Sequence, residues 1–267
     1  MRRSVYIVFA LALVPSLSCG QSLRDRLVDN HYAYTPHGRG PFPALIAIPG
    51  CSGISTGDPI IEESNPELRE DDLLFRRHYR SMAERLREKG FAVYLIDVHT
   101  AEGVLTACAE EIQRERLAQY IDEAIAWIRE QPTVKNDSIH LIGWSMGGRG
   151  VLQWLHGPRK ESDSVQSAIA VYPPCAGHPD LSISLPILLL LGGADDIADP
   201  SECEQLIGAS PVKEKVLVRN YPGARHGFDI SEAPPVVNIG GGMTIGYQKE
   251  AADASWGEIV TFLIAGD

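Results

Sequence analysis

The chain has 267 residues, of which 44% are hydrophobic and 22% are charged, and its formal net charge at pH 7 is −11. This length and composition are typical of one large globular domain with a substantial core. The negative charge disfavours nucleic acid and anionic membrane surfaces as partners, but it does not identify a substrate.

The first twenty residues have the pattern of an export signal. Arg2 and Arg3 precede an apolar run over 5–14, which has the length of a signal-peptide core and is too short to span a membrane. A buried N-terminal strand is the alternative, but it would begin directly behind two arginines with no turn signal. We therefore expect residues 1–20 to be a signal peptide and residues 21–267 to form a single domain.

Cys19 leaves two routes of processing open. The segment Leu17-Ser18-Cys19-Gly20 resembles a bacterial lipoprotein processing site, although Ser16 stands where such sites usually have leucine. We expect a soluble periplasmic or secreted product first, and a product lipid-anchored at Cys19 second. A membrane is expected as a partner only in the second case.

Apolar strand-like runs alternate with amphipathic helical patterns along the rest of the chain. The predicted strands cover 44–48, 91–96, 139–142, 167–172, 186–191 and 215–220, and residues 32–34 can add an antiparallel strand at the edge. The predicted helices cover 72–90, 112–130, 148–155 and 251–264, with another beginning near Pro200. Continuous apolar strands separated by helices predict a mostly parallel central sheet with helices on both faces, in one α/β domain.

Three segments lack regular patterning and are predicted as loops. They cover 51–71, which is acidic and polar, 100–109, and the proline- and glycine-rich 228–246. All three follow the carboxyl ends of predicted strands, where ligands bind in sheets of this kind. Loops of this length in a compact domain are often functional, so we expect the active site to lie among them; 52–71 and 228–246 are candidates for a lid.

Residues 139–150 carry the most informative motif of the chain. Ser145 lies at the centre of Gly143-x-Ser145-x-Gly147, after an apolar strand and before a helix. This strand–turn–helix context is typical of a nucleophile elbow, whose tight turn needs glycine on both sides of the serine. The turn would hold the Ser145 hydroxyl at the carboxyl end of a strand and direct the next backbone N–H, that of Met146, toward the same point.

A serine hydroxyl needs a base and an orienting acid, and the later strands supply both. In this kind of fold the three residues occur in the order serine, acid, histidine. Asp195 follows the strand 186–191 in a glycine turn, and His226 follows the last strand. Asp196 and Asp199 compete with Asp195, which could also be a plain turn aspartate; Asp196 could instead cap the next helix or face solvent.

The second oxyanion donor is expected in the loop after the first parallel strand. The backbone N–H of Cys51, in Pro49-Gly50-Cys51-Ser52-Gly53, would pair with that of Met146. A Cys51 nucleophile is the rival interpretation, but Cys51 lacks the elbow geometry. His99, at the end of another strand, is a weaker candidate for substrate contact.

Four cysteines remain after the predicted processing: Cys51, Cys108, Cys175 and Cys203. An even number in an exported protein indicates disulfides, and four cysteines allow three pairings. Four buried free thiols are the alternative. No cysteine or histidine spacing indicates a metal site, and the sequence predicts no cofactor.

Five motifs together resemble the dienelactone hydrolase family of α/β-hydrolases, in the order in which that family has them, over about residues 40–265. They are Pro49-Gly50-Cys51-Ser52-Gly53, Gly143-Trp144-Ser145-Met146-Gly147-Gly148, Tyr172-Pro173-Pro174-Cys175, Gly192-Gly193-Ala194-Asp195-Asp196 and Tyr221-Pro222-Gly223-Ala224-Arg225-His226-Gly227-Phe228. The resemblance implies an α/β-hydrolase fold and, by analogy with exported relatives, the disulfide pairs Cys51–Cys108 and Cys175–Cys203. The chain departs from the founding members, which use a cysteine nucleophile and have His-Gly where Pro49-Gly50 stands, so dienelactone itself is not the expected substrate.

The predicted function is hydrolysis of small or medium carboxylic esters or lactones through an acyl-enzyme at Ser145. Trp144, Tyr172 and Phe228 are candidates for substrate contact, with core packing as the alternative for Trp144 and Tyr172. A peptidase-like acyl hydrolase is a second interpretation, although such enzymes usually carry a large extra domain. A non-catalytic binding protein on the same scaffold is a third, although such proteins typically lose the nucleophile or the base. The sequence does not indicate an oligomeric state.

Overall fold

The computed structural model describes residues 21–54, 77–104, 107–108, 112–157 and 162–266. The predicted signal peptide with Cys19, the beginning of the predicted helix 72–90 and most of the predicted loop 51–71 lie outside the described residues.

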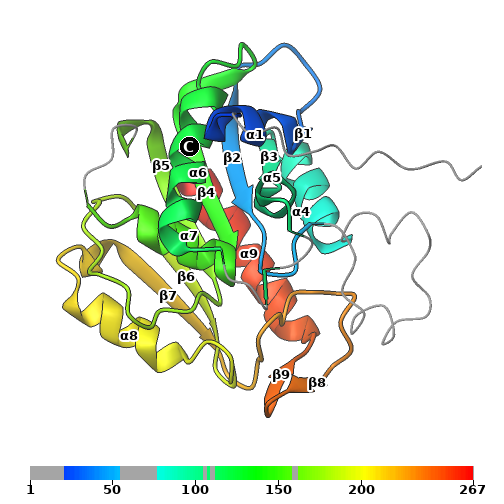
Figure 1. Ribbon diagram of the computed structural model, residues 1–267, viewed down its shortest axis with the longest axis vertical. Helices are drawn as coiled ribbons and strands as arrows, with labels where there is room; N and C mark the ends of the chain where they lie inside the picture. The colour runs from blue at the N-terminus through cyan, green and yellow to red at the C-terminus, as the bar shows by residue number, and fades with distance from the viewer. Residues whose placement is uncertain (1–20, 55–76, 105–106, 109–111, 158–161, 267) are drawn as a thin grey trace, which may run out of the picture.

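A seven-stranded sheet lies at the centre of the molecule, with the strand order β1-β3-β2-β4-β5-β6-β7 (Figure 1). The strands are β1 (His31–Tyr34), β2 (Phe42–Ile48), β3 (Ala92–Ile96), β4 (Val134–Trp144), β5 (Val165–Val171), β6 (Ile187–Gly192) and β7 (Val216–Tyr221). β2 to β7 pair in parallel, and β1 pairs antiparallel with β3 at one edge. The prediction of six parallel strands and one antiparallel edge strand is confirmed.

The inner parallel strands are largely apolar because helices cover both faces of the sheet. Every residue of β3 and of β6 is buried, and so are the last seven residues of β4. β4 starts five residues earlier than the predicted strand, and its first residue, Val134, pairs with Phe42 across a shift in register. That first part is largely exposed and polar, which is why the apolar run alone did not predict it.

Two hydrophobic clusters lie on opposite faces of the sheet. One joins the sheet to α1 (Leu23–Asp29), α6 (Arg114–Ile128), α7 (Met146–Trp154) and α8 (Pro200–Ala209), and the other joins it to α4 (Arg77–Glu88) and α9 (Lys249–Gly266). In Figure 1, α6 and α7 lie in front of the strands and α9 lies behind them. The two layers of helices and the central sheet form one domain, as predicted.

The structure adds two helices and a β-hairpin where the sequence predicted none. α1 is a seven-residue helix with a capping box, in which the Ser22 hydroxyl and the Asp25 carboxylate each accept from the other's backbone N–H. α5 (Val98–Glu102) occupies the start of the predicted loop 100–109. The predicted loop 228–246 contains an antiparallel hairpin, β8 (Val237–Gly240) and β9 (Met243–Ile245). α5 and the two strands of the hairpin have five residues or fewer, and α1 has seven and owes its start to a cap. All of them are too short to show a period in the sequence.

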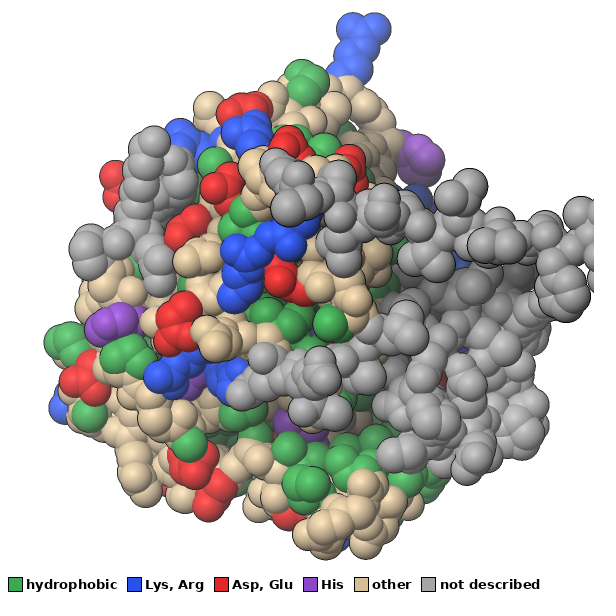
Figure 2. Space-filling model, in the orientation of Figure 1, with side chains coloured by type: hydrophobic (Ala, Val, Ile, Leu, Met, Phe, Trp, Pro, Cys, Tyr) green, Lys and Arg blue, Asp and Glu red, His purple; other side chains and the backbone are tan. Residues whose placement is uncertain are grey.

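The outer face formed by α6 and α7 carries charges of both signs. Figure 2 shows acidic and basic side chains intermixed over this face of the described chain rather than gathered into one patch. None of the helices in the described ranges is long and apolar enough to cross a membrane.

Candidate active site

Ser145 lies in a sharp turn between the end of β4 and the start of α7. Its backbone has a φ of 48°, in the left-handed region that residues with a side chain seldom adopt. The flanking glycines are needed for space: a Cβ on Gly143 would lie 2.4 Å from the carbonyl carbon of Gly147, and one on Gly147 would lie 2.2 Å from the carbonyl oxygen of Ile48. The local sequence therefore folds into the strained turn that the motif predicts.

The structure brings Ser145, His226 and Asp195 into one hydrogen-bonded chain. His226 Nδ1 lies 2.7 Å from Asp195 Oδ2, and His226 Nε2 lies 2.8 Å from Ser145 Oγ. Because a carboxylate only accepts hydrogen bonds, Nδ1 carries the imidazole proton, and Nε2 is left to accept the hydroxyl proton of Ser145. The arrangement can remove a proton from Ser145 when its oxygen attacks a carbonyl carbon.

The Asp195 carboxylate is fixed on both of its oxygens. Its side chain is 1% exposed, and Oδ1 accepts from the backbone N–H groups of Ile197 and Ala198 at 2.9 and 2.8 Å. The two competing aspartates have other partners. Asp199 caps α8 by accepting from the N–H of Ser201, and the exposed Asp196 accepts from Thr244, which lowers the pKa of the Asp196 carboxyl.

Asp196 therefore does not cap the helix that begins at Pro200. Its side chain faces solvent, which was the other predicted role, and pairs with Arg225 at 3.6 Å. Only Asp195 of the three aspartates reaches His226.

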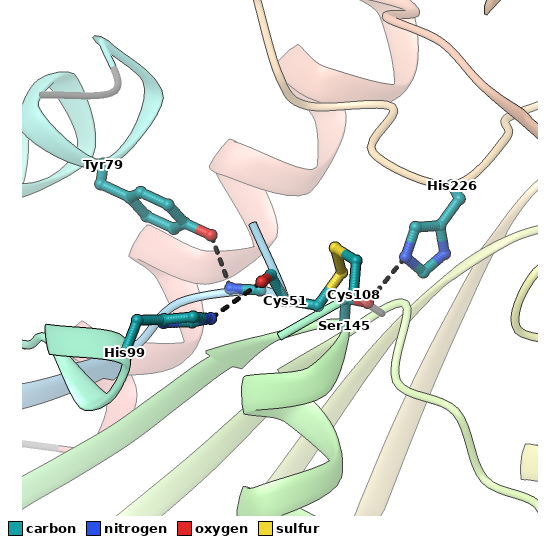
Figure 3. The surroundings of a disulfide bond; sticks show 7 residues. Cys51, Tyr79, His99, Cys108, Ser145 and His226 are labelled. Atoms are coloured by element: carbon teal, nitrogen blue, oxygen red, sulfur yellow. Dashed lines mark hydrogen bonds between the residues drawn. A yellow bond between two sulfur atoms is a disulfide. The ribbon is translucent and has the colours of Figure 1, made fainter. Parts of the chain in front are cut away.

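The loop after β2 is held on both sides of the Cys51 amide (Figure 3). The Gly50 N–H donates to the Tyr79 hydroxyl at 2.7 Å, and the Gly50 carbonyl accepts from the Gly53 N–H at 3.0 Å. The Cys51 carbonyl accepts from His99 Nε2 and from the Ala107 N–H, both at 2.8 Å. These contacts fix the peptide planes before and after Cys51. They also give buried His99 a role in holding this loop.

Both disulfides implied by the family resemblance are present, Cys51–Cys108 and Cys175–Cys203. Figure 3 shows the Cys51–Cys108 bridge beside Ser145, with His226 on the other side. The bridge joins the loop after β2 to the segment that follows α5. It is thus a covalent restraint on the same loop that Tyr79 and His99 hold by hydrogen bonds.

Removing the Cys51–Cys108 bridge is expected to lower turnover by more than the accompanying loss of stability explains. Replacing Cys51 and Cys108 together by alanine keeps the backbone N–H of residue 51 but frees its loop, and we expect kcat to fall at least about tenfold. The bridge closes a separation of 57 residues, so the free energy of unfolding should fall by about 4 kcal/mol. Ester turnover and denaturant unfolding measure the two effects.

The second disulfide supplies the matched control for that experiment. Replacing Cys175 and Cys203 by alanine opens a separation of 28 residues and should cost about 3.5 kcal/mol of stability, with kcat kept within about twofold of the parent. Equal losses of kcat in both double variants would contradict a specific role of the Cys51–Cys108 bridge.

The three predicted substrate-contact residues are all buried. Trp144 is 1% exposed, Tyr172 3% and Phe228 0%, and the Tyr172 ring packs against His226 with 4.7 Å between ring centroids. This is the packing role left open for Trp144 and Tyr172, while a contact with substrate stays a prediction for all three. The sequence interpretation missed Asp229, whose carboxylate accepts from both Trp144 and Tyr172. The available signal was its place three residues after His226.

Within the described ranges, no group of three or more His, Cys, Asp or Glu side chains is placed to hold a metal ion.

Comparisons with known proteins agree with this architecture. The model of the dienelactone hydrolase family matches residues 75–265. No curated protein gives a significant match. The solved structures described below share 15–17% identity with the chain, so they show the fold alone, and that fold is the α/β-hydrolase fold.

Three solved structures illustrate the likeness. A Klebsiella pneumoniae protein assigned as a dienelactone hydrolase has 17% identity and a TM-score of 0.63, covering 88% of this chain and 92% of that chain. A dienelactone hydrolase-like promiscuous phosphotriesterase from metagenomic libraries has 15% identity and a TM-score of 0.63, with 89% and 99% covered. Butyrate-bound esterase 2 of Thermogutta terrifontis has 16% identity and a TM-score of 0.56, with 88% of each chain covered.

Proposed function

The chain belongs to the dienelactone hydrolase family, and on that premise we propose that it is a serine hydrolase that cleaves carboxylic esters or lactones through an acyl-enzyme at Ser145. The observation that carries the proposal is the continuous chain of hydrogen bonds from Asp195 through His226 to Ser145, at 2.7 and 2.8 Å, at the nucleophile turn. The esterases among the structural neighbours support an ester as the substrate.

The proposed reaction has two halves. In the first, Ser145 Oγ attacks the ester carbonyl while His226 Nε2 takes its proton, and the leaving alcohol then receives that proton. In the second, His226 takes a proton from water, which attacks the acyl carbon; the bond to Ser145 Oγ then breaks, Oγ regains the proton from His226, and the acid is released. Asp195 holds the imidazole in the required tautomer and stabilises its charged form.

The oxyanion of each tetrahedral intermediate is assigned to the backbone N–H groups of Cys51 and Met146. Met146 is the first residue of α7, and its N–H has no partner within the helix. The contacts that fix the Gly50 and Cys51 carbonyls favour a donor at residue 51 that is already oriented before substrate arrives. Such a preformed donor would act without reorganisation during the reaction.

A panel of substrates tests the proposal against its alternatives. We expect hydrolysis of p-nitrophenyl esters, fastest for a small or medium acyl chain, and of some lactones, with no cleavage of peptide anilides. The butyrate found in the Thermogutta esterase favours a short acyl group as the starting point. Cleavage of anilides at rates similar to the esters would favour a peptidase, and the absence of turnover on every member would favour a binding protein.

The place of action is proposed from the disulfides and the N-terminal sequence together. Two disulfides are consistent with an exported protein, because the cytosol of most cells keeps thiols reduced. We infer that residues 1–20 direct export, with a periplasmic or secreted product, or a product lipid-anchored at Cys19. Mass determination of the mature protein decides between them, and retention of residues 1–20 would contradict both.

A further inference from the structure

Asp229 is a buried carboxylate that none of the proposed chemical steps uses. Its side chain is 10% exposed and lies in the loop three residues beyond His226. Oδ1 accepts from the Tyr172 hydroxyl at 2.7 Å, and Oδ2 accepts from Trp144 Nε1 at 2.9 Å. On the α4 side, His78 Nε2 lies 3.5 Å from Oδ2. A single carboxylate thus joins the end of β4, the end of β5 and the His226 loop.

The two side chains that donate to Asp229 both adjoin the proposed nucleophile and base. Trp144 directly precedes Ser145, and the Tyr172 ring lies against the His226 imidazole at 4.7 Å between centroids. Within the described residues, Ser145 and Tyr172 are also the two non-glycine residues with positive φ, at 48° and 36°. Strained backbone of this kind persists only where side-chain contacts hold it in place, and it is typical of functional sites.

The protonation state of Tyr172 agrees with the direction of its hydrogen bond. Burial, together with the nearby Asp229 carboxylate, raises the pKa of the Tyr172 phenol well above its usual value. The phenol therefore stays protonated and donates to Asp229. The Tyr172 ring is nearly inaccessible and its hydroxyl is fixed by Asp229. The orientation of the ring against the His226 imidazole is therefore fixed as well.

We propose that Asp229 is a positioning residue. Through Tyr172 it holds the His226 imidazole, and through Trp144 it holds the Ser145 turn, in the relative orientation that the reaction needs. This inference rests on the proposed function, because it assigns Asp229 a role toward the same nucleophile and base. Asp229 acts on the geometry of these groups and does not touch substrate. Its loss should consequently lower kcat and leave KM nearly unchanged.

Four variants test the contact from both sides. Asp229→Ala and Tyr172→Phe are each expected to lower kcat at least about tenfold, with KM within about twofold of the parent. The double variant should be no slower than Asp229→Ala, because both changes remove one contact. Asp229→Asn should recover kcat to within about threefold of the parent, since an amide can accept from Trp144 and donate to the Tyr172 hydroxyl.

A control for general destabilisation is present elsewhere in the chain. Trp154 Nε1 donates to Asp122 Oδ1 at 2.8 Å between α7 and α6, a contact of the same kind away from the site. Asp122→Ala should lower the melting temperature while kcat stays within about twofold of the parent. Thermal unfolding of each variant, measured beside kcat and KM, separates the two effects.

Several outcomes would overturn the inference. They are a kcat within twofold of the parent in both Asp229→Ala and Tyr172→Phe, an equal loss of kcat in Asp122→Ala, or no recovery in Asp229→Asn. Each of these overturns the role of Asp229 while loss of turnover in Ser145→Ala still supports the proposed function. Turnover retained in Ser145→Ala would instead overturn the proposed function, and this inference with it.

Discussion

Ser145→Ala is expected to lower kcat for p-nitrophenyl ester hydrolysis by about 10⁴- to 10⁶-fold. Alanine lacks the oxygen that lies 2.8 Å from His226 Nε2, so no acyl-enzyme can form and His226 has no proton to accept. The remaining donors and the binding site can give only a small residual rate. The fold should be unaffected, because the change removes one atom and leaves Gly143 and Gly147 in place.

The measurement is initial-rate turnover with the thermal unfolding of both proteins compared. Ser138, a buried serine in the same strand β4, gives a matched control: Ser138→Ala should keep kcat within about twofold of the parent. Wild-type turnover in Ser145→Ala would contradict the assignment of the nucleophile.

Asp195→Asn is expected to lower kcat by about 10⁴-fold, although the side chain keeps its shape. The backbone N–H groups of Ile197 and Ala198 need an acceptor, so the amide oxygen should remain with them and the NH₂ should face His226 Nδ1. Nδ1 must then accept, and the imidazole proton moves to Nε2. In that tautomer His226 cannot take the proton of Ser145.

Asp196→Asn is the matched control, one residue further along the chain. Asp196 is exposed and accepts from Thr244 rather than from His226, so its neutral variant should keep kcat within about twofold of the parent. A loss of activity in Asp196→Asn with normal activity in Asp195→Asn would reverse the assignment of the acid.

The sheet could be predicted because its strands are short, apolar and separated by helices. β3 and β6, which the runs at 91–96 and 186–191 predicted, are buried on both faces, and an apolar run is the direct consequence of that environment. Chain order then constrained the site, since the acid and the histidine follow the later strands. The glycines around Ser145 were readable for a similar reason, because backbone lies where their Cβ atoms would be.

Other features depend on contacts that no sequence period encodes. The strands of the hairpin β8–β9 have only four and three residues and bury none of them fully, so their alternation is too short to predict a strand. Asp229 is one of 35 acidic residues, and its importance follows only from two donors, Trp144 at the end of β4 and Tyr172 just after β5, that are far from it in sequence. Tyr79 and His99 likewise reach the Gly50–Cys51 segment from other elements.

Covalent labelling of the nucleophile tests the central claim most directly. The protein is treated with a fluorophosphonate probe, digested with trypsin and analysed by fragment-ion mass spectrometry. The relevant peptide, residues 136–149, contains Ser138 and Ser145, which the fragment ions distinguish. We predict one adduct on Ser145, absent from Ser145→Ala and much reduced in Asp195→Asn. An adduct on another residue, or labelling that persists in Ser145→Ala, would contradict the account.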